Sequence, residues 1–258
     1  MKLFYREIGG QGSSIIILHG LFGSSDNWLP QAKMLSGQYR VYLPDLRNHG
    51  QSPHAEEFNY KLMAEDIREF IQQHQILAPV LIGHSMGGKV AMTLATHYPK
   101  IPSRLIIVDI APRAYAAQHD RILEGLLSIP VEEVQSRAET DEALANYVDD
   151  PDVRQFLLKN LQRKPGGGFR WKMNLGAISR HISSVGAAVE KGKSFEGPVL
   201  IIRGARSSYI GDNDMEGIHA LFPEARLLTL DTGHWVQSEK PRELVDAVAG
   251  FLQEDENA

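Results

Sequence analysis

Residues 79–91 read PVLIGHSMGGKVA, in which a run of apolar residues ends at a serine with a glycine two positions away on either side. The run has the length of a buried strand, and residues 86–98 after it have the composition of a helix. A serine between a strand and a helix, in the pattern G-x-S-x-G, lies on a sharp, strained turn that raises its hydroxyl above the sheet edge. Gly83 and Gly87 suit this turn because a side chain at either position would collide with the closely packed backbone. The stretch therefore predicts Ser85 as a nucleophile.

Short apolar runs alternate with amphipathic stretches along most of the chain. Six runs are predicted to be strands, at residues 15–18, 39–44, 79–83, 104–110, 198–204 and 225–231. They are apolar almost throughout, as expected of strands that are covered on both faces. Between them, Met63, Ile67, Phe70 and Ile71 recur at helical spacing. The alternation predicts an α/β fold with a mostly parallel central sheet flanked by helices.

The alternation stops between residues 111 and 197, where helix-like patches occur without a convincing buried strand. Insertions of this size usually form a lid over the carboxyl edge of an open sheet, where ligands bind. We therefore expect residues 111–197 to form a helical lid, and residues 1–110 and 198–258 to form the core.

The charge of this lid is uneven. Residues 112–152 contain ten acidic and three basic residues, whereas residues 153–193, which include Lys191, contain nine basic residues and one acid. Because arginine and lysine bind phosphate well, we expect the second half to favour substrates such as coenzyme A esters. The residues expected to contact such a substrate are Arg163, Lys164, Arg170 and Lys172. A solvated helix face is the alternative interpretation.

The bulk composition excludes several classes of protein. The net charge of −5 argues against a general nucleic-acid binder, which needs a basic surface. The absence of cysteine excludes disulfides and thiol nucleophiles, and no histidines have a metal-binding spacing such as H-E-x-x-H. The N-terminus has no signal-peptide core, and residues 15–18 are too few to span a membrane. These features predict a cytoplasmic protein without a metal site.

A serine hydroxyl needs a base, and His234 is the best placed of the ten histidines. It lies in a loop between the last predicted strand and the last predicted helix, so it comes from the same sheet edge as Ser85. An earlier bend, LHGLFG, offers the backbone N–H groups of Leu21 or Phe22. Together with the N–H of Met86, these groups are expected to form an oxyanion hole.

Five motifs, HGLFGS, PDLRNHGQSP, GHSMGG, VDIAP and GHW, occur in the order seen in α/β-hydrolases. Their combination, above all RNHG and GHSMGGK, resembles the bacterial YbfF-type esterases over the whole chain, most specifically outside the lid. The resemblance implies an α/β-hydrolase fold and a cytoplasmic serine esterase or thioesterase without a cofactor. Such an enzyme would act on acyl esters and on thioesters such as acyl-CoA.

The acid that would orient His234 is less obvious. In many α/β-hydrolases the strand after the lid ends in G-x-x-D, but here it reads RGARSS and places Ser207 where the acid is expected. A serine cannot stabilise an imidazolium as a carboxylate does. Asp109 ends the strand after the nucleophile helix, and family members that resemble this chain carry aspartate in the same VDIAP context. We therefore assign Asp109 as the acid, with Asp212 and Asp214 as alternatives.

The resulting prediction is a two-step acyl transfer. His234 deprotonates Ser85, Ser85 attacks the acyl carbonyl, and water then releases the acyl-enzyme. His19, Ser207 and Trp235 are expected beside the small-molecule substrate. The alternatives are a carbon–carbon bond hydrolase or lyase with the same triad, and a non-catalytic receptor that binds a small ligand beneath the lid. The fold alone does not choose among them.

Overall fold

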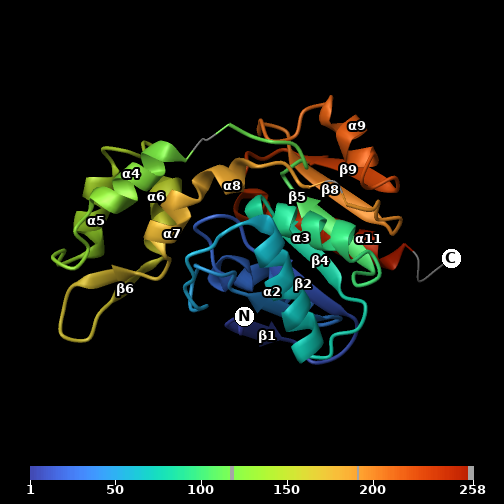
Figure 1. The fold of residues 1–258 in the computed structure, drawn as a ribbon, viewed down its shortest axis with the longest axis horizontal. Coiled ribbons are helices and arrows are strands. Elements are labelled where there is room, and N and C mark those ends of the chain that lie inside the picture. Colours follow the sequence, from blue (N-terminus) through green and yellow to red (C-terminus); the bar gives the residue numbers. More distant parts are fainter. Residues whose placement is uncertain (117–118, 191, 255–258) are drawn as a thin grey trace.

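The computed structural model describes residues 1–116, 119–190 and 192–254. Its centre is a seven-stranded sheet with the strand order β1-β3-β2-β4-β5-β8-β9 (Figure 1). In this sheet β1 is antiparallel to β3, and the other neighbouring pairs are parallel. The strands are β1 (Tyr5–Ile8), β2 (Ser14–Leu18), β3 (Arg40–Pro44), β4 (Val80–His84), β5 (Arg104–Val108), β8 (Val199–Gly204) and β9 (Ala225–Leu230). The predicted mostly parallel α/β sheet is confirmed.

The strands read as apolar throughout because the sheet has an apolar cluster on each face. In β2, Ile16 and Leu18 belong to one cluster, and Ile15 and Ile17 belong to the other. The first cluster includes residues of α2 (Tyr60–Gln73) and α3 (Met86–His97), and the second includes residues of α1 (Leu29–Leu35) and α11 (Pro241–Gln253). Helices therefore cover both faces of the sheet. None of the helices in the described residues has the length and apolar character needed to cross a bilayer.

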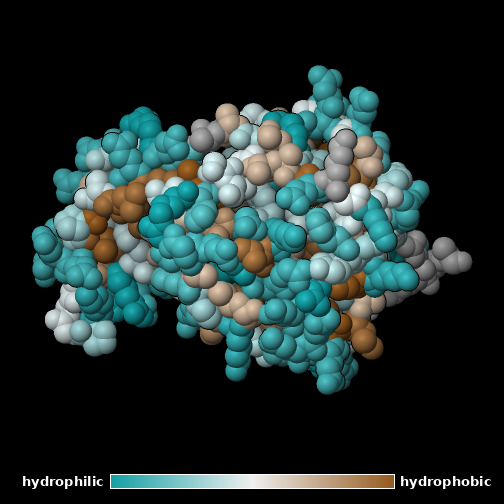
Figure 2. Space-filling model, viewed as in Figure 1, coloured by the Kyte–Doolittle hydropathy of each residue, from teal (hydrophilic) through white to brown (hydrophobic). Residues whose placement is uncertain are grey.

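The segment between β5 and β8 leaves the sheet and lies largely to one side of it (Figure 1). We call residues 111–197 the lid, in the sense predicted from the sequence. In the space-filling view, a band of apolar residues crosses the lid where its helices meet, while polar residues cover most of this side of the molecule (Figure 2). The helices of the lid are α4 (Asp120–Ser128), α5 (Arg137–Leu144), α6 (Pro151–Leu158), α7 (Leu175–Arg180) and α8 (Ile182–Gly186).

Three strands were not expected from the sequence. The edge strand β1, YREI, carries two charged residues and no fully buried side chain. In the lid, β6 (Leu161–Arg163) and β7 (Phe169–Trp171) form an antiparallel hairpin, in which Leu161 and Phe169 are buried. Its loop is the PGGGF stretch, whose three glycines all have positive φ angles. Strands this short or this polar give no apolar run, so their sequences carry little signal.

Candidate active site

The predicted turn at the serine is present in the structure. Ser85 lies between β4 and α3 with φ 52° and ψ −119°, a backbone conformation that residues other than glycine rarely adopt. Its N–H donates to the carbonyl of Val108 at 3.0 Å, which ties the turn to β5. A Cβ atom at Gly83 would collide with the carbonyl of Gly87, and one at Gly87 would collide with the carbonyl of Leu18. The glycines therefore allow the backbone to pack closely enough to hold Ser85 in this conformation.

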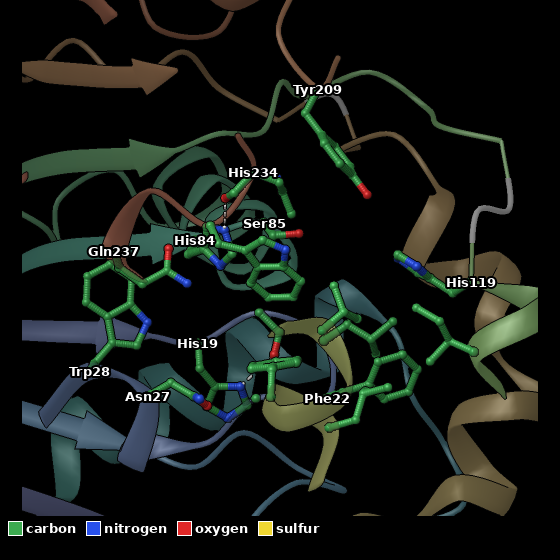
Figure 3. A pocket seen from close by; sticks show the side chains of 18 residues that line it. His19, Phe22, Asn27, Trp28, His84, Ser85, His119, Tyr209, His234 and Gln237 are labelled. Atoms are coloured by element: carbon green, nitrogen blue, oxygen red, sulfur yellow. Dashed lines mark hydrogen bonds between the residues drawn. The ribbon is translucent and has the colours of Figure 1, made fainter. Parts of the chain in front are cut away.

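The structure brings His234 and Asp109 together at the edge that carries Ser85. Nδ1–H of His234 donates to Oδ2 of Asp109 at 2.7 Å, and the backbone N–H of Gly204 donates to Oδ1 of Asp109 at 2.9 Å. Asp109 is completely buried. With its Nδ1 proton held by a carboxylate, the imidazole of His234 leaves Nε2 free to take a proton. His234 and Ser85 both line the same cavity (Figure 3).

Ser207 contacts the carboxylate, not the cavity. Its hydroxyl donates to the same Oδ2 of Asp109 that His234 binds, and it is absent from the described lining of the cavity. Ser207 was expected to bind substrate, but its partner in the structure is the carboxylate of Asp109. The alternative acids lie elsewhere: Asp212 pairs with Arg203 at 2.6 Å, and Asp214 pairs with Arg113 at 2.8 Å.

Of the three amides expected to form an oxyanion hole, that of Phe22 already has a partner. Its N–H donates to Nε2 of His49 at 3.2 Å. Among the hydrogen bonds of the described residues, the N–H of Leu21 has no acceptor. The N–H of Met86 lies in the first turn of α3, where amides have no acceptor within the helix. Leu21 and Met86 are thus the two amides available to an oxyanion, and Phe22 contributes its ring to the cavity wall.

Two buried histidines hold the loops around this site. His19 donates from Nδ1 to the carbonyl of Gly20 at 2.8 Å and accepts at Nε2 from the N–H of Leu46 at 3.0 Å. His49 donates from Nδ1 to the carbonyl of Arg47 at 2.9 Å. Burial lowers the pKa of His19 to about 4 and that of His49 to about 3, so both rings are neutral at neutral pH. His19 also lines the cavity, as expected from the sequence.

A cavity of about 230 Å³ surrounds Ser85. One wall is apolar and comes partly from α4 and α6 of the lid, and Trp235, expected beside the substrate, belongs to it through ring contact with Phe156 at 4.6 Å. A second, narrow cavity of about 30 Å³ also reaches Ser85, between Tyr60, Tyr115 and Tyr209. The apolar side chains of the larger cavity are Leu21, Phe22, Trp28, Ile122, Val153, Phe156, Leu157 and Trp235. No aspartate, glutamate, lysine or arginine is among its described lining residues.

Two residues beside His234 were given no role from the sequence. His84 donates from Nε2 to the backbone carbonyl of His234 at 2.9 Å, and burial lowers its pKa to about 3. The ring of Tyr209 stacks on that of His234, with centroids 3.9 Å apart. His84 can be located in the sequence, because it directly precedes the serine in the pattern G-x-S-x-G. Tyr209 cannot, because its position depends on the fold of the loop after β8.

The four basic residues expected to bind substrate phosphates do not line the cavity in the described structure. They lie on or beside the β6–β7 hairpin, where Lys164 pairs with Glu132 at 3.1 Å and Lys172 with Asp26 at 3.7 Å. Arg170 donates to Gln162 at 3.0 Å, and Arg163 lies over the ring of Phe169. Their contact with a substrate therefore stays a prediction, and it would have to occur outside the cavity at Ser85. Lys191, counted in the basic half of the lid, lies outside the described residues.

No cluster of three or more histidine, aspartate or glutamate side chains suited to a metal ion occurs in the part of the chain that the structure describes. The arrangement at Ser85 needs none for acyl transfer, since a nucleophile, a base, an acid and two amides meet at one cavity. These groups are the ones that nucleophilic catalysis by serine requires.

Comparisons with known proteins agree with this arrangement. Residues 14–146 match the family model described as "alpha/beta hydrolase fold". The chain is 35% identical over 264 residues to the mouse "sn-1-specific diacylglycerol lipase ABHD11", covering 98% of this chain and 85% of that protein. It is 32% identical over 260 residues to "Esterase YbfF" of Escherichia coli, covering 98% and 100% of the two chains. A solved structure, "Marine microorganism esterase", superposes with a TM-score of 0.95 at 39% identity, covering 97% and 99%. The chain therefore belongs to the α/β-hydrolase family, and the expected resemblance to the YbfF-type esterases is confirmed.

Proposed function

We propose that the chain is a serine hydrolase that cleaves carboxylic esters through an acyl-enzyme. The observation that carries this proposal is the meeting of the strained Ser85 turn with the 2.7 Å bond between His234 and Asp109. The names of the relatives, esterase and diacylglycerol lipase, support ester hydrolysis. An uncharged and largely apolar cavity supports an uncharged acyl ester as the substrate.

The reaction runs in two steps. Nε2 of His234 takes the proton of Ser85 as its oxygen attacks the carbonyl carbon, and the resulting oxyanion accepts from the N–H groups of Leu21 and Met86. The imidazolium then donates its proton to the leaving alcohol, and the acyl-enzyme remains. Water repeats the sequence with His234 as base, which releases the acid and regenerates Ser85. The buried carboxylate of Asp109 stabilises the imidazolium in both steps.

Thioesters fall within the same proposal, because a thiolate leaves from the same tetrahedral intermediate. The phosphates of an acyl-CoA would have to lie outside the cavity, since no lysine or arginine is among its described lining residues. Acyl-CoA hydrolysis is therefore supported by the shared acyl chemistry and by the resemblance to the YbfF-type esterases, and not by a phosphate contact in the cavity.

Active-site labelling and substitution test the proposal. We expect the wild type to react with a fluorophosphonate at Ser85 and to hydrolyse a p-nitrophenyl ester and the acyl-CoA of the same chain. Ser85→Ala and His234→Ala should each lower kcat by about 10⁴-fold or more, and the double variant should lose little more, because the two residues act as a unit. The kcat of the wild type and of each variant is measured with saturating substrate.

The matched control is Ser103→Ala, at an exposed serine in the turn before β5. It should keep wild-type turnover and labelling. If Ser85→Ala kept most of its turnover, the nucleophile would lie elsewhere. A wild type that neither reacts with the fluorophosphonate nor turns over would indicate the receptor alternative.

A further inference from the structure

The cavity around Ser85 has two chemically different ends. In Figure 3, Phe22 and His119 lie on one side of Ser85, and Trp28, Asn27 and Gln237 lie on the other. The first side belongs with the lid, because His119 directly precedes α4. The second side is built from the core, by the 3-10 helix η1 (Ser25–Trp28) and by α10 (Val236–Glu239). An ester bound at Ser85 therefore has one part facing the lid and one part facing the core.

The core end presents buried polar atoms that lack partners. Gln237 is only 4% exposed and lines the cavity; its Oε1 is buried away from accessible space, and its Nε2 donates none of the hydrogen bonds of the described residues. Trp28 is 2% exposed and lines the cavity, and its Nε1 donates none of the hydrogen bonds of the described residues. Behind them, Gln31 donates from Nε2 to the backbone carbonyl of Gln237 at 2.6 Å, which fixes the start of α10 against α1. Polar groups in a protein interior are almost always hydrogen-bonded, so these two unpaired N–H donors on the cavity wall favour an acceptor that occupies the cavity.

That partner must be polar and uncharged. A buried carboxylate or ammonium group needs a counter-charge, and none of the described lining residues is an aspartate, glutamate, lysine or arginine. The buried histidines of the lining do not supply one, because burial lowers the pKa of His19, His84 and His119 and keeps these rings neutral at neutral pH. A purely apolar chain would also fit poorly, since it would leave the indole N–H and the carboxamide unpaired.

We propose that Trp28 and Gln237 form a subsite for a neutral hydrogen-bonding group of the ester, such as a hydroxyl, while the apolar remainder lies beneath the lid. The inference rests on the ester hydrolysis proposed above and narrows its substrates to amphipathic, uncharged esters. The Nε1 of Trp28 and the Nε2 of Gln237 both donate to this group, whose oxygen accepts. The polar group belongs either to the acyl chain or to the alcohol, and matched substrates distinguish the two.

Two pairs of esters test the subsite. Butyl octanoate is compared with its counterpart that carries a terminal hydroxyl on the butyl group, and methyl hexanoate with its counterpart that carries a terminal hydroxyl on the acyl chain. We expect the wild type to prefer the hydroxylated member of one pair by about tenfold in kcat/KM. The pair that shows the preference identifies the part of the ester that faces the core end.

Substitution at the subsite should remove this preference. Gln237→Met keeps the length of the side chain and removes its hydrogen bonds, so kcat/KM should fall about tenfold for the preferred hydroxylated ester and stay within about twofold for its plain counterpart. Trp28→Phe should act in the same direction and serves as the second variant if Gln237→Met does not fold. Gln72→Met, at an exposed position of α2, is the matched control and should keep the preference.

The outcomes separate the subsite from the proposed function. A wild type that hydrolyses all four esters without preference overturns the subsite alone. Equal losses for plain and hydroxylated esters in Gln237→Met also overturn it, because they indicate a structural role in holding the loop of His234. A wild type that hydrolyses none of the esters and does not react with a fluorophosphonate overturns the proposed function and the subsite with it.

Discussion

At the scale of single residues, the site is marked by backbone strain. Ser85 and Asp109 both have a φ of 52°, and Phe22 has a φ of 59°. These values lie in the left-handed region, which costs free energy for residues other than glycine and persists only where the surroundings impose it. Each of the three follows a strand at the carboxyl edge or lies in the loop after it. The strain therefore occurs at two residues that line the cavity, Ser85 and Phe22, and at the aspartate that binds His234.

The carboxylate of Asp109 gives the first residue-scale prediction. Asp109→Asn should leave the fold intact but lower kcat by about three to four orders of magnitude, because an amide no longer holds His234 in the tautomer with a free Nε2. Adding Ser207→Asp should recover part of the activity, since the Ser207 hydroxyl already contacts the atom of Asp109 that His234 binds. The measurement is kcat with a p-nitrophenyl ester, alongside circular dichroism for the fold.

A matched double variant separates charge from size. Ser207→Asn in the Asp109→Asn background has the same volume as the rescuing aspartate but no charge, and it should recover nothing. If Asp109→Asn turned over at nearly the wild-type rate, another group would have to supply the acid. Asp212 and Asp214 would then have to leave their pairs with Arg203 and Arg113.

At the scale of elements, the sheet could be predicted from sequence and the lid only in outline. The six inner and edge strands that face apolar clusters give apolar runs, so each was found. The hairpin β6–β7 was not, because its strands are three residues long and largely exposed. The lid was predicted from the break in alternation, which gives no information on how its helices pack against the core.

The residues of the candidate site also fall into two groups, those that the sequence predicts and those that it does not. Ser85, His234 and Asp109 follow strands whose carboxyl ends must meet in a parallel sheet, so their positions in the chain predict their proximity. Trp28, Gln237 and Tyr209 reach the cavity from a 3-10 helix, a four-residue helix and a loop. The placement of these residues depends on how the short elements pack, and no spacing of residues in the sequence indicates that packing. The position of the basic residues of the lid is not evident from the sequence for the same reason, since Lys164 and Lys172 pair with Glu132 and Asp26, which are distant in the chain.

One prediction concerns helix α6 of the lid. Phe156 is the α6 residue whose ring contacts Trp235, and Val153 and Leu157 of the same helix line the cavity beside it. Phe156→Ala should lower kcat/KM for an octanoyl ester by about tenfold, because less of the chain is buried, and should change kcat/KM for the acetyl ester by less than about twofold. The measurement is a chain-length series of p-nitrophenyl esters.

The control for this series is Phe4→Ala, a half-buried phenylalanine next to β1 and outside the described lining of the cavity. It should leave the dependence on chain length unchanged. Equal losses for acetyl and octanoyl esters in Phe156→Ala would show that the ring supports the fold of the lid and does not contact the chain.

At the scale of the whole molecule, three neutral histidines hold the carboxyl edge together. His19, His49 and His84 are almost completely buried and bind backbone groups of the loops that carry Gly20, Phe22 and His234. Burial lowers their pKa values to about 4, about 3 and about 3. Protonation would also place a hydrogen on Nε2 of His19 and His49, where each ring now accepts from an amide. The architecture of the site therefore requires all three rings to stay uncharged.

This requirement predicts a loss of stability in mild acid. In the unfolded chain these histidines titrate near pH 6.5, so between about pH 6.5 and pH 4 the unfolded state binds more protons than the folded state. Stability is therefore complete above pH 6.5 and falls as the pH drops, by up to about 1.4 kcal/mol per pH unit for each histidine. Three such groups remove about 4 kcal/mol of stability per pH unit, which approaches the whole stability of an ordinary domain within two pH units.

Urea unfolding between pH 7.5 and pH 4.5 measures how steeply the free energy of unfolding depends on pH. His49→Gln should reduce this slope by about a third, whereas His54→Gln, at an exposed histidine, should leave it unchanged. An equal slope in the wild type and in His49→Gln would mean that protons bound at other groups, and not at the buried rings, drive the acid transition.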